Sequence, residues 1–309
     1  MMRAMLSVGR RQERLFLTGA NGLIGTAVCK AAVARGYNVL GMCRKPDAVL
    51  PVGCEKVTGT MRDLPWSRIE AFAPTTLLHL AWTARPGVNF TSPENEELIT
   101  QSEALFTGLL DRGVRHLAGT GTFIEYATSP HPLVEDISPQ KSLVPYSQAK
   151  LATLGRLRQI TEGTGVSWSW FRVFNAYGEG EDAARMTSAL MRHLAAGIPV
   201  SVKTPASLRD YIHASDVAEG MLTSLDSGLA DVVNIGTGVG VRVLDLARQI
   251  AIAAGADPGL VTAQDPPNED LMPCAIADSS KLRSTGWSPR VSLENGLQRL
   301  SRSIHILPK

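Results

Sequence analysis

Three glycines near the start of the chain have the spacing of a phosphate-binding turn. Gly19, Gly22 and Gly25 stand three residues apart. The run before them, 14–18, is short and apolar and predicts a buried strand, and the run after them, 26–34, predicts a helix. Glycine allows a sharp turn and a close approach by a pyrophosphate, which the helix N-terminus attracts with free N–H groups. The commonest dinucleotide pattern is Gly-x-Gly-x-x-Gly, so a glycine turn without a ligand is the alternative interpretation.

A tyrosine and a lysine four residues apart could form an acid–base pair. Pro145 is tolerated in the first turn of a helix, and Tyr146 and Lys150 then share one helix face. A free tyrosine has a pKa near 10, and a neighbouring ammonium group favours the phenolate, which lowers that pKa toward a useful range. The alternative is an incidental surface pair.

The elements that would position these residues alternate between strand and helix. Apolar runs predict strands at 14–18, 37–43, 54–57, 76–80, 114–118 and 167–173, and helices at 26–34, 94–112 and 146–162. This alternation predicts an α/β protein with a parallel sheet, helices on both of its faces and ligands at the carboxyl ends of its strands. Five residues near those ends are expected to line one crevice: Thr18, Arg44, Ala81, Thr122 and Asn175.

Composition limits the classes of function. The chain has 309 residues and 44% hydrophobic content, enough for one large domain or two small ones. A net charge of +2 gives no electrostatic argument for binding nucleic acid or a membrane surface. The four cysteines form no Cys-x-x-Cys pair, so we expect no metal site, no disulfide framework and a reducing, cytoplasmic compartment. We find neither a signal-peptide pattern nor an apolar run long enough to span a membrane.

Several further motifs follow one another along the chain. They are Leu78-His79-Leu80-Ala81-Trp82, Thr122 before Glu125-Tyr126, Tyr146-x-x-x-Lys150, Arg172-Val173-Phe174-Asn175-Ala176-Tyr177-Gly178, Arg209-Asp210-Tyr211-Ile212-His213 and Asn234-Ile235-Gly236-Thr237-Gly238. With the glycine turn, they resemble the extended short-chain dehydrogenase/reductase family in its nucleotide-sugar-modifying branch. The resemblance runs from about Arg14 to the end of the chain. It implies a Rossmann-type doubly wound parallel sheet with a smaller C-terminal lobe for the sugar nucleotide.

The resemblance also implies where the two parts lie. The dinucleotide-binding domain is expected to comprise residues 1–176, with returning pieces at about 214–239 and 273–285. The sugar-nucleotide lobe, within 177–309, is then discontinuous, at about 177–213, 240–272 and 286–309.

Catalytic roles carry over residue by residue from the resemblance. Tyr146 matches the family's catalytic tyrosine, and Lys150 matches the lysine that also holds the nicotinamide ribose. Thr122 matches the Ser/Thr that hydrogen-bonds the reacting oxygen, because it lies four residues before Tyr126. Thr120 is a rival hydroxyl in the same run.

Two further positions match contacts to the phosphates of a sugar nucleotide. These are Asn175 and Arg209, for which the alternatives are that Asn175 caps a turn and that Arg209 pairs with a surface carboxylate. The family often has an arginine where this chain has Asn268 with two acids beside it. We therefore expect Arg185 and Arg209 to supply the diphosphate contacts.

The cofactor is predicted to be NADP(H) rather than NAD(H). An NAD-specific site places an acidic residue about 20 residues past the glycines, and residues 41–45 contain none. Arg44 could grip a 2′-phosphate with its planar fork and Lys45 adds a second charge, unless both are solvated surface cations. Met61 is expected to cover the adenine ring. The complete predicted set is Gly19, Asn21, Gly22, Leu23, Ile24, Gly25, Arg44, Lys45, Met61, Leu80, Ala81, Trp82, Tyr146 and Lys150.

One departure from the family narrows the reaction. Sugar-nucleotide 4,6-dehydratases carry Asp-Glu after the catalytic threonine, whereas this chain has Phe123 and Ile124, which cannot move protons. Stretches 81–87, 92–95 and 121–126 resemble NDP-4-keto-6-deoxysugar 4-ketoreductases. We therefore expect NADPH-dependent reduction of the C4 keto group of a nucleotide-linked 4-keto-6-deoxy sugar. An NDP-sugar C4-epimerase is the alternative, and a non-catalytic dinucleotide sensor is less favoured because it needs no proton donor.

A homodimer is also expected. Helices 94–112 and 147–162 carry more apolar side chains than one sheet face needs, and the equivalent helices pair across a two-fold axis in the family. The side chains in question are Leu98, Leu105, Leu109, Leu151, Leu154 and Leu157.

Overall fold

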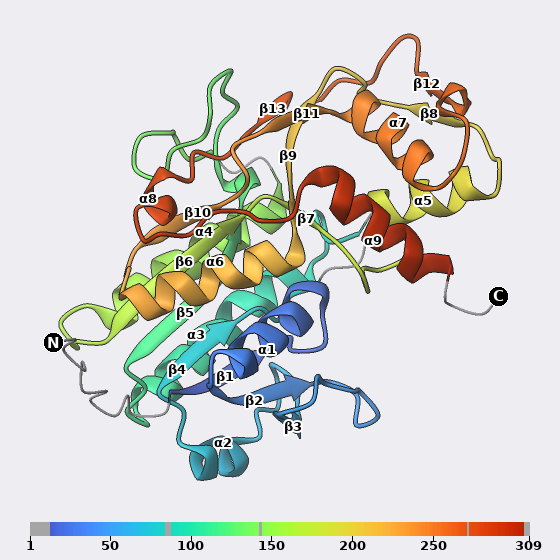
Figure 1. Ribbon diagram of the computed structural model, residues 1–309. Helices are drawn as coiled ribbons and strands as arrows, with labels where there is room; N and C mark the ends of the chain where they lie inside the picture. Colours follow the sequence, from blue (N-terminus) through green and yellow to red (C-terminus); the bar gives the residue numbers. More distant parts are fainter. Residues whose placement is uncertain (1–12, 84–87, 142–143, 271, 306–309) are drawn as a thin grey trace, which may run out of the picture.

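A seven-stranded parallel sheet forms the centre of the molecule (Figure 1). The computed structural model describes residues 13–83, 88–141, 144–270 and 272–305. The strand order is β10-β6-β5-β4-β1-β2-β3, and every neighbouring pair is parallel. The strands are β1 (Arg14–Thr18), β2 (Asn38–Cys43), β3 (Cys54–Thr58), β4 (Thr76–His79), β5 (His116–Thr122), β6 (Ser167–Val173) and β10 (Val232–Ile235). The doubly wound α/β fold predicted from the sequence is confirmed.

Helices cover both faces of this sheet, as the alternation predicted. The helices α1 (Leu23–Ala34) and α6 (Ala214–Ser227) pack together on one face, and α3 (Glu94–Leu110) and α4 (Pro145–Thr161) pack together on the other. Side chains of β1 alternate between two cores, with Leu15 and Leu17 under α1 and Phe16 in the cluster that includes Leu105 and Leu154. A short helix, α2 (Trp66–Phe72), was not predicted.

The remaining elements form a second group with its own core. The strands are β7 (Asn175–Tyr177), β8 (Val200–Val202), β9 (Leu208–His213), β11 (Gly240–Arg242), β12 (Val261–Ala263) and β13 (Cys274–Ala275). The helices are α5 (Met186–Ala195), α7 (Val243–Ala253) and α9 (Leu293–His305), whereas α8 (Ser280–Arg283) packs against β10 of the large sheet, with Leu282 in the core beneath α6. β9 pairs with β7, β11 and β13, whereas β8 pairs with β12. Residues of α5, α7 and α9 share one apolar cluster, separate from the two that line the large sheet.

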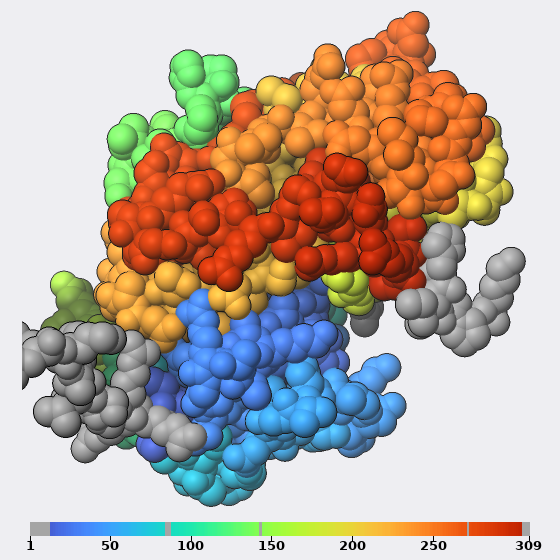
Figure 2. Space-filling view, viewed as in Figure 1, coloured from blue at the N-terminus to red at the C-terminus, as the bar shows by residue number. Residues whose placement is uncertain are grey.

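The C-terminal segment connects this group to the large sheet. Figure 2 shows it as a red strip that lies against the orange residues of α6 and α7. The Trp287 indole N–H donates to the Asp216 carbonyl at 3.2 Å, and the Val291 N–H donates to the Asp216 carboxylate at 2.9 Å. Asp216 lies in the first turn of α6, so these bonds fix the strip to the helix that covers the sheet.

Most of the leucines that motivated the dimer are buried within the chain itself. Leu105, Leu109, Leu154 and Leu157 belong to the core beneath α3 and α4, and Leu98 is 8% exposed. They cover the sheet and each other, so the apolar argument for a dimer interface was wrong. The dimer now rests on the family resemblance.

β5 continues four residues beyond its predicted end, to Thr122. Its two glycines, Gly119 and Gly121, face the Trp170 indole of β6, where an added Cβ would overlap the ring. The two threonines of the same run, Thr120 and Thr122, point to the opposite face because side chains alternate along a strand. Glycine and threonine thus take opposite faces of one strand.

We predict that Gly119→Ala destabilises the protein. The new methyl group would meet the Trp170 ring, which is 1% exposed and cannot move without repacking the core. Overpacking of this kind costs about 1–3 kcal/mol in the free energy of unfolding, measured by urea denaturation. The matched control is Gly155→Ala in α4, where no atom lies within 4 Å and alanine should stabilise by about 0.5–1 kcal/mol. Equal effects of the two substitutions would contradict this packing.

Candidate active site

The glycine turn is packed so closely that it leaves no room for side chains. Gly19 has φ 69°, a conformation that favours glycine, and a Cβ there would lie 2.9 Å from the Ala81 nitrogen. A Cβ on Gly25 would overlap the Gly19 carbonyl, and the Gly22 N–H donates to that carbonyl at 3.0 Å. The turn leads directly into α1 at Leu23. The backbone is therefore open to a pyrophosphate at the helix N-terminus, which fits the dinucleotide site predicted here.

A buried hydrogen-bonded chain holds the ends of β1 and β4 together. The Thr18 hydroxyl accepts the N–H groups of Leu80 and Ala81 at 3.2 and 3.1 Å, and it lies 2.7 Å from Nδ1 of His79. The hydroxyl therefore donates to Nδ1, while Nε2, 3.0 Å from the Ser102 hydroxyl, carries the proton. Burial lowers the pKa of His79 to about 3, so the ring is neutral. This chain fixes Leu80 and Ala81 beside the glycine turn.

The catalytic helix α4 brings Tyr146 and Lys150 to the same place. The Lys150 ammonium donates to the Thr120 carbonyl at 2.7 Å and lies 3.7 Å from the centre of the Trp82 ring. The Tyr146 ring meets the edges of Trp82 and Phe90, with centroids 6.4 and 5.9 Å apart. Lys150 is thus buried and Tyr146 is half-buried, with aromatic rings beside both, so the two residues are not a solvated surface pair.

Burial sets the acid–base properties of this pair. The pKa of Tyr146 is raised, first by burial and then by the negative charge of Glu125, while Arg185 opposes the rise. Burial lowers the pKa of Lys150 to about 7. The pKa of Tyr146 is therefore raised, whereas the sequence predicted that Lys150 would lower it. The Lys150 ammonium is directed to the Thr120 carbonyl instead.

The two rival threonines are bonded differently. The Thr120 hydroxyl donates to the His79 carbonyl at 3.1 Å, which joins β5 to β4. The Thr122 N–H donates to the Glu125 carboxylate at 2.9 Å, and Thr122 is 8% exposed. Thr122 is therefore the better candidate for bonding a reacting oxygen, because the Thr120 hydroxyl is engaged within the sheet.

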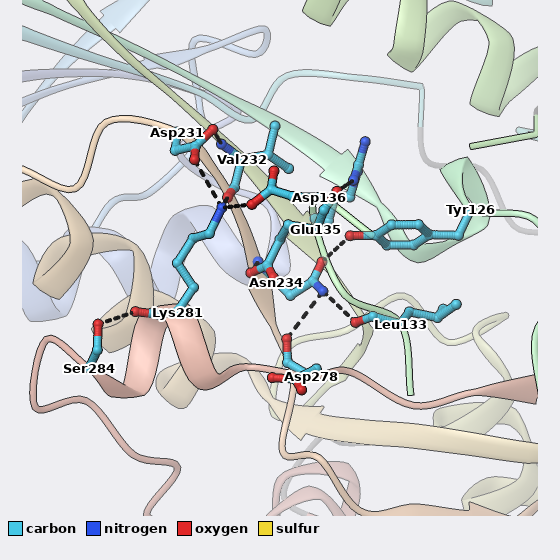
Figure 3. Close-up of polar contacts among 11 residues, drawn as sticks. Tyr126, Leu133, Glu135, Asp136, Asp231, Val232, Asn234, Asp278, Lys281 and Ser284 are labelled. Carbon is cyan, nitrogen blue, oxygen red and sulfur yellow. Dashed lines mark hydrogen bonds and ion pairs between the residues drawn. The ribbon is translucent and has the colours of Figure 1, made fainter. Parts of the chain in front are cut away.

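The sequence analysis did not predict a polar network that includes Tyr126, which follows Thr122 by four residues. The Tyr126 hydroxyl donates to the Asn234 side chain at 2.7 Å, and that amide donates to the carbonyls of Leu133 and Asp278, as Figure 3 shows. The Asn234 N–H in turn donates to the Glu135 carboxylate at 2.7 Å. Tyr126 and Asn234 were quoted only as family motifs. The signal that could have identified the network is the polar asparagine in an otherwise apolar edge strand.

The residues predicted for the adenosine half lie at the ends of β2 and β3. Arg44 and Lys45 follow β2 and are exposed, and neither forms an ion pair within the described residues. Met61 is half-buried against the core beneath α3.

The other predicted cofactor contacts lie in and after the glycine turn. Asn21 is exposed in this turn. Leu23 and Ile24, in the first turn of α1, are half-buried.

The predicted phosphate contacts are engaged within the chain. Arg209 forms an ion pair with Asp270 at 2.5 Å, which is the carboxylate pairing weighed as its alternative. Arg185 donates to the Ala176 carbonyl at 2.7 Å. The Asn175 amide donates to the Asp210 carbonyl at 3.0 Å and ties β7 to β9. The structure thus brings Tyr146, Lys150 and Trp82 together beside the end of β5, which carries Thr122, whereas the charge of Arg209 is balanced by Asp270.

Three other findings concern the remaining predictions. Residues 84–87 of the reductase-like loop lie outside the described residues. Over the described ranges, no helix is both long and apolar enough to cross a membrane. In the same part of the chain, no three His, Cys, Asp or Glu side chains come together as metal ligands would.

A parallel sheet with a glycine turn and a Thr-Tyr-Lys set at its carboxyl edge defines a dinucleotide-dependent enzyme of the Rossmann type. The model of the NAD dependent epimerase/dehydratase family matches residues 15–236, and the chain belongs to this family. Its resemblance to the nucleotide-sugar-modifying branch is confirmed by the relatives it matches.

Those relatives cover nearly the whole chain. GDP-L-fucose synthase 1 of Arabidopsis thaliana is 26% identical over 95% of this chain and 93% of its own length. The dTDP-4-dehydro-6-deoxyglucose reductase of Escherichia coli is 25% identical over 95% and 98%. The solved structure of UDP-glucose 4-epimerase from Thermus thermophilus, in complex with NAD, is 25% identical with a TM-score of 0.83 and covers 95% of this chain and 99% of that chain.

We predict that acid destabilises the protein through one buried and one half-buried histidine. Burial lowers the pKa of His79 to about 3 and that of His116 to about 4, from an ordinary 6.5. Below pH 6.5 the unfolded chain binds protons at these histidines, whereas the folded chain does not. The free energy of unfolding is therefore highest above pH 6.5 and decreases as the pH falls below it. Each histidine should cost about 1 kcal/mol of unfolding free energy per pH unit. Urea unfolding of the protein and of His116→Gln at pH 7 and pH 5 measures this. A pH dependence no shallower in the variant would contradict it.

Proposed function

We propose that this enzyme reduces the C4 keto group of a nucleotide-linked 4-keto-6-deoxy sugar with NADPH. The observation that carries the proposal is the bond from Lys150, on the same helix as Tyr146, to the Thr120 carbonyl, two residues before Thr122 at the end of β5. Thr122 is followed by Phe123 and Ile124, where a dehydratase needs an acid and a base. The similarity to an E. coli enzyme named for reduction of a 4-dehydro-6-deoxy sugar supports it.

The chain's part in this reaction is to hold the substrate oxygen and donate a proton to it. When bound, the reduced nicotinamide supplies the hydride. Tyr146 is protonated at neutral pH, as a phenol with an ordinary pKa near 10 already is, so it can donate a proton to the substrate oxygen. The Thr122 hydroxyl hydrogen-bonds the same oxygen, and Lys150, with a pKa near 7, holds the ribose. The aromatic rings of Trp82 and Phe90 keep water from the phenol.

NADP(H) is the proposed cofactor. The exposed cations Arg44 and Lys45 follow β2, and no carboxylate stands among residues 41–45 to repel a 2′-phosphate. The glycine turn and the N-terminus of α1 would hold the pyrophosphate.

The sugar nucleotide would bind between the large sheet and the second group of elements. We propose a dinucleotide-binding domain of residues 1–176, 214–239 and 273–285, with a nucleotide-sugar lobe formed by the rest. The entry of β10 into the large sheet and the separate core of α5, α7 and α9 support this division. A diphosphate would compete with Asp270 for Arg209.

A C4-epimerase is the second candidate. The similarity to the Thermus thermophilus UDP-glucose 4-epimerase supports it, and an epimerase would use the same Thr122, Tyr146 and Lys150. The two differ in cofactor balance, because a reductase consumes NADPH and an epimerase regenerates its cofactor. A dinucleotide sensor is disfavoured, since it has no use for a buried proton donor.

We predict that Tyr146→Phe separates chemistry from binding. Removing the proton donor should lower turnover on the order of 10²–10⁴-fold with little change in NADPH affinity. Lys150→Ala should lose both cofactor affinity and rate. Steady-state kinetics and NADPH fluorescence titration measure the two effects. Wild-type turnover in Tyr146→Phe would refute the mechanism.

We predict that Arg44→Ala selectively weakens NADP⁺ binding. Loss of a bidentate contact to the 2′-phosphate should cost roughly 10-fold or more in affinity for NADP⁺, with NAD⁺ affinity unchanged. Lys30→Ala is the matched control, because Lys30 is an exposed cation of α1 outside the predicted set. Calorimetric titration with both dinucleotides is the measurement. Equal wild-type affinities for NAD⁺ and NADP⁺ would overturn the cofactor proposal.

We predict a homodimer from the family resemblance. Light scattering at micromolar concentration should give twice the mass of 33.1 kDa. A monomer under those conditions would contradict it, leaving the active-site proposals unchanged.

A further inference from the structure

A completely buried ion pair lies next to the proposed oxyanion-binding threonine. The side chains of Glu125 and Arg172 are both 0% exposed, with Nε and Oε2 2.7 Å apart. The Glu125 carboxylate also accepts the Thr122 N–H at 2.9 Å and the Trp170 indole N–H at 3.2 Å from each oxygen. One carboxylate therefore binds the main chain of Thr122 and two side chains of β6.

The surrounding backbone is shaped to admit this carboxylate. A Cβ on Gly121 would overlap both Glu125 Oε1 and the Trp170 indole nitrogen. Gly121 directly precedes Thr122, so β5 has no side chain at the position that the Glu125 carboxylate approaches. Glycine here permits the close contact, which a larger residue would prevent.

Stability alone does not account for this pair. Desolvating two charges commonly costs as much as their attraction returns, and well-packed apolar residues of similar volume often serve equally well. The pair is also incompletely satisfied, because Arg172 Nη2 has no hydrogen-bond partner in the described part of the chain. Arg172 otherwise packs 4.4 Å from the centre of the Tyr126 ring.

We propose that Glu125 is a positioning residue, whose carboxylate fixes the main chain of Thr122 and places a buried negative charge beside Tyr146 and Lys150. This inference rests on the proposed reductase function for its catalytic meaning. Glu125 itself touches no reacting atom. It acts in two ways: its carboxylate holds the main chain of Thr122, and its negative charge acts on Tyr146 and Lys150 of α4.

The electrostatic half of the proposal concerns both members of the Tyr–Lys pair. Burial raises the pKa of Tyr146, and the Glu125 charge raises it further. Burial lowers the pKa of Lys150 to about 7, and Glu125 opposes that fall, which keeps more of the lysine charged. The other charged or titratable groups in contact with this assembly are Arg172 on β6, Arg185 before α5, His79 on β4, Tyr126 after the turn and the Glu135 segment.

The test uses variants that separate charge from geometry. Glu125→Gln with Arg172→Met removes both charges together, so no unpaired ion is buried, and glutamine can still accept the Thr122 N–H. Glu125→Leu with Arg172→Met removes the acceptor as well. The matched control is Glu135→Gln, which neutralises a buried carboxylate of the neighbouring network that bonds the Asn234 N–H instead of Thr122.

The first readout is the pH titration of Lys150, which NMR of ¹³Cε-labelled lysine monitors in samples prepared without nucleotide. The Lys150→Arg variant identifies the Lys150 signal. The glutamine double variant should lower the Lys150 midpoint, because Glu125 is the charge that raises the pKa of Lys150, while Glu135→Gln leaves the midpoint in place. A midpoint unchanged by the glutamine double variant would overturn the electrostatic role. This titration needs no turnover, so an inactive wild-type enzyme would count against the proposed function and not against Glu125.

The second readout is turnover. The leucine double variant should lose up to roughly 10²-fold in kcat relative to the glutamine double variant, with NADPH affinity unchanged, because Thr122 loses its main-chain anchor. Equal kcat in the two double variants, both folded by circular dichroism, would overturn the positioning role.

Discussion

The Thr18 hydroxyl fixes the geometry on which the whole site depends. It accepts the N–H groups of Leu80 and Ala81 and donates to the buried His79, which locks the end of β1 against the end of β4. The glycine turn then fits directly against Ala81, since Gly19 leaves no space for a side chain there. A dinucleotide laid along this edge would contact the turn, the segment after β4 and the catalytic helix together.

From this junction, polar contacts lead to the proposed catalytic residues through neighbouring strands. The Thr120 hydroxyl bonds the His79 carbonyl, and the Thr120 carbonyl receives the Lys150 ammonium. β4, β5 and α4 are thereby connected by polar contacts around a site that is otherwise walled by aromatic rings. Low solvation strengthens electrostatic interactions in such a site and raises the pKa of Tyr146. The same burial lowers the pKa of Lys150 to about 7, and the Glu125 charge opposes that fall.

Local patterns in the sequence were sufficient for the fold and for the Tyr–Lys pair. The spacing of three glycines and of Tyr146 and Lys150 reflects backbone geometry within a single turn, which one segment of sequence specifies. Pairings between distant segments were not readable. The ion pair of Arg209 with Asp270 joins residues 61 positions apart, and that of Glu125 with Arg172 joins residues 47 apart. The leucines of α3 and α4 misled because an apolar helix side facing a sheet and one facing another subunit have the same pattern. The raised pKa of Tyr146 was missed because burial depends on the packed structure.

The central claim is that a keto sugar bound beside Tyr146 receives a hydride from NADPH and a proton from Tyr146, with net consumption of NADPH. The most direct measurement is a single turnover with C4-deuterated NADPH and a nucleotide-linked 4-keto-6-deoxy sugar, followed by mass spectrometry and NMR of the product. The account predicts stoichiometric oxidation of NADPH and deuterium at C4 of a hydroxy sugar. A C4-epimeric pair of hydroxy sugars interconverted with no net loss of NADPH would contradict it.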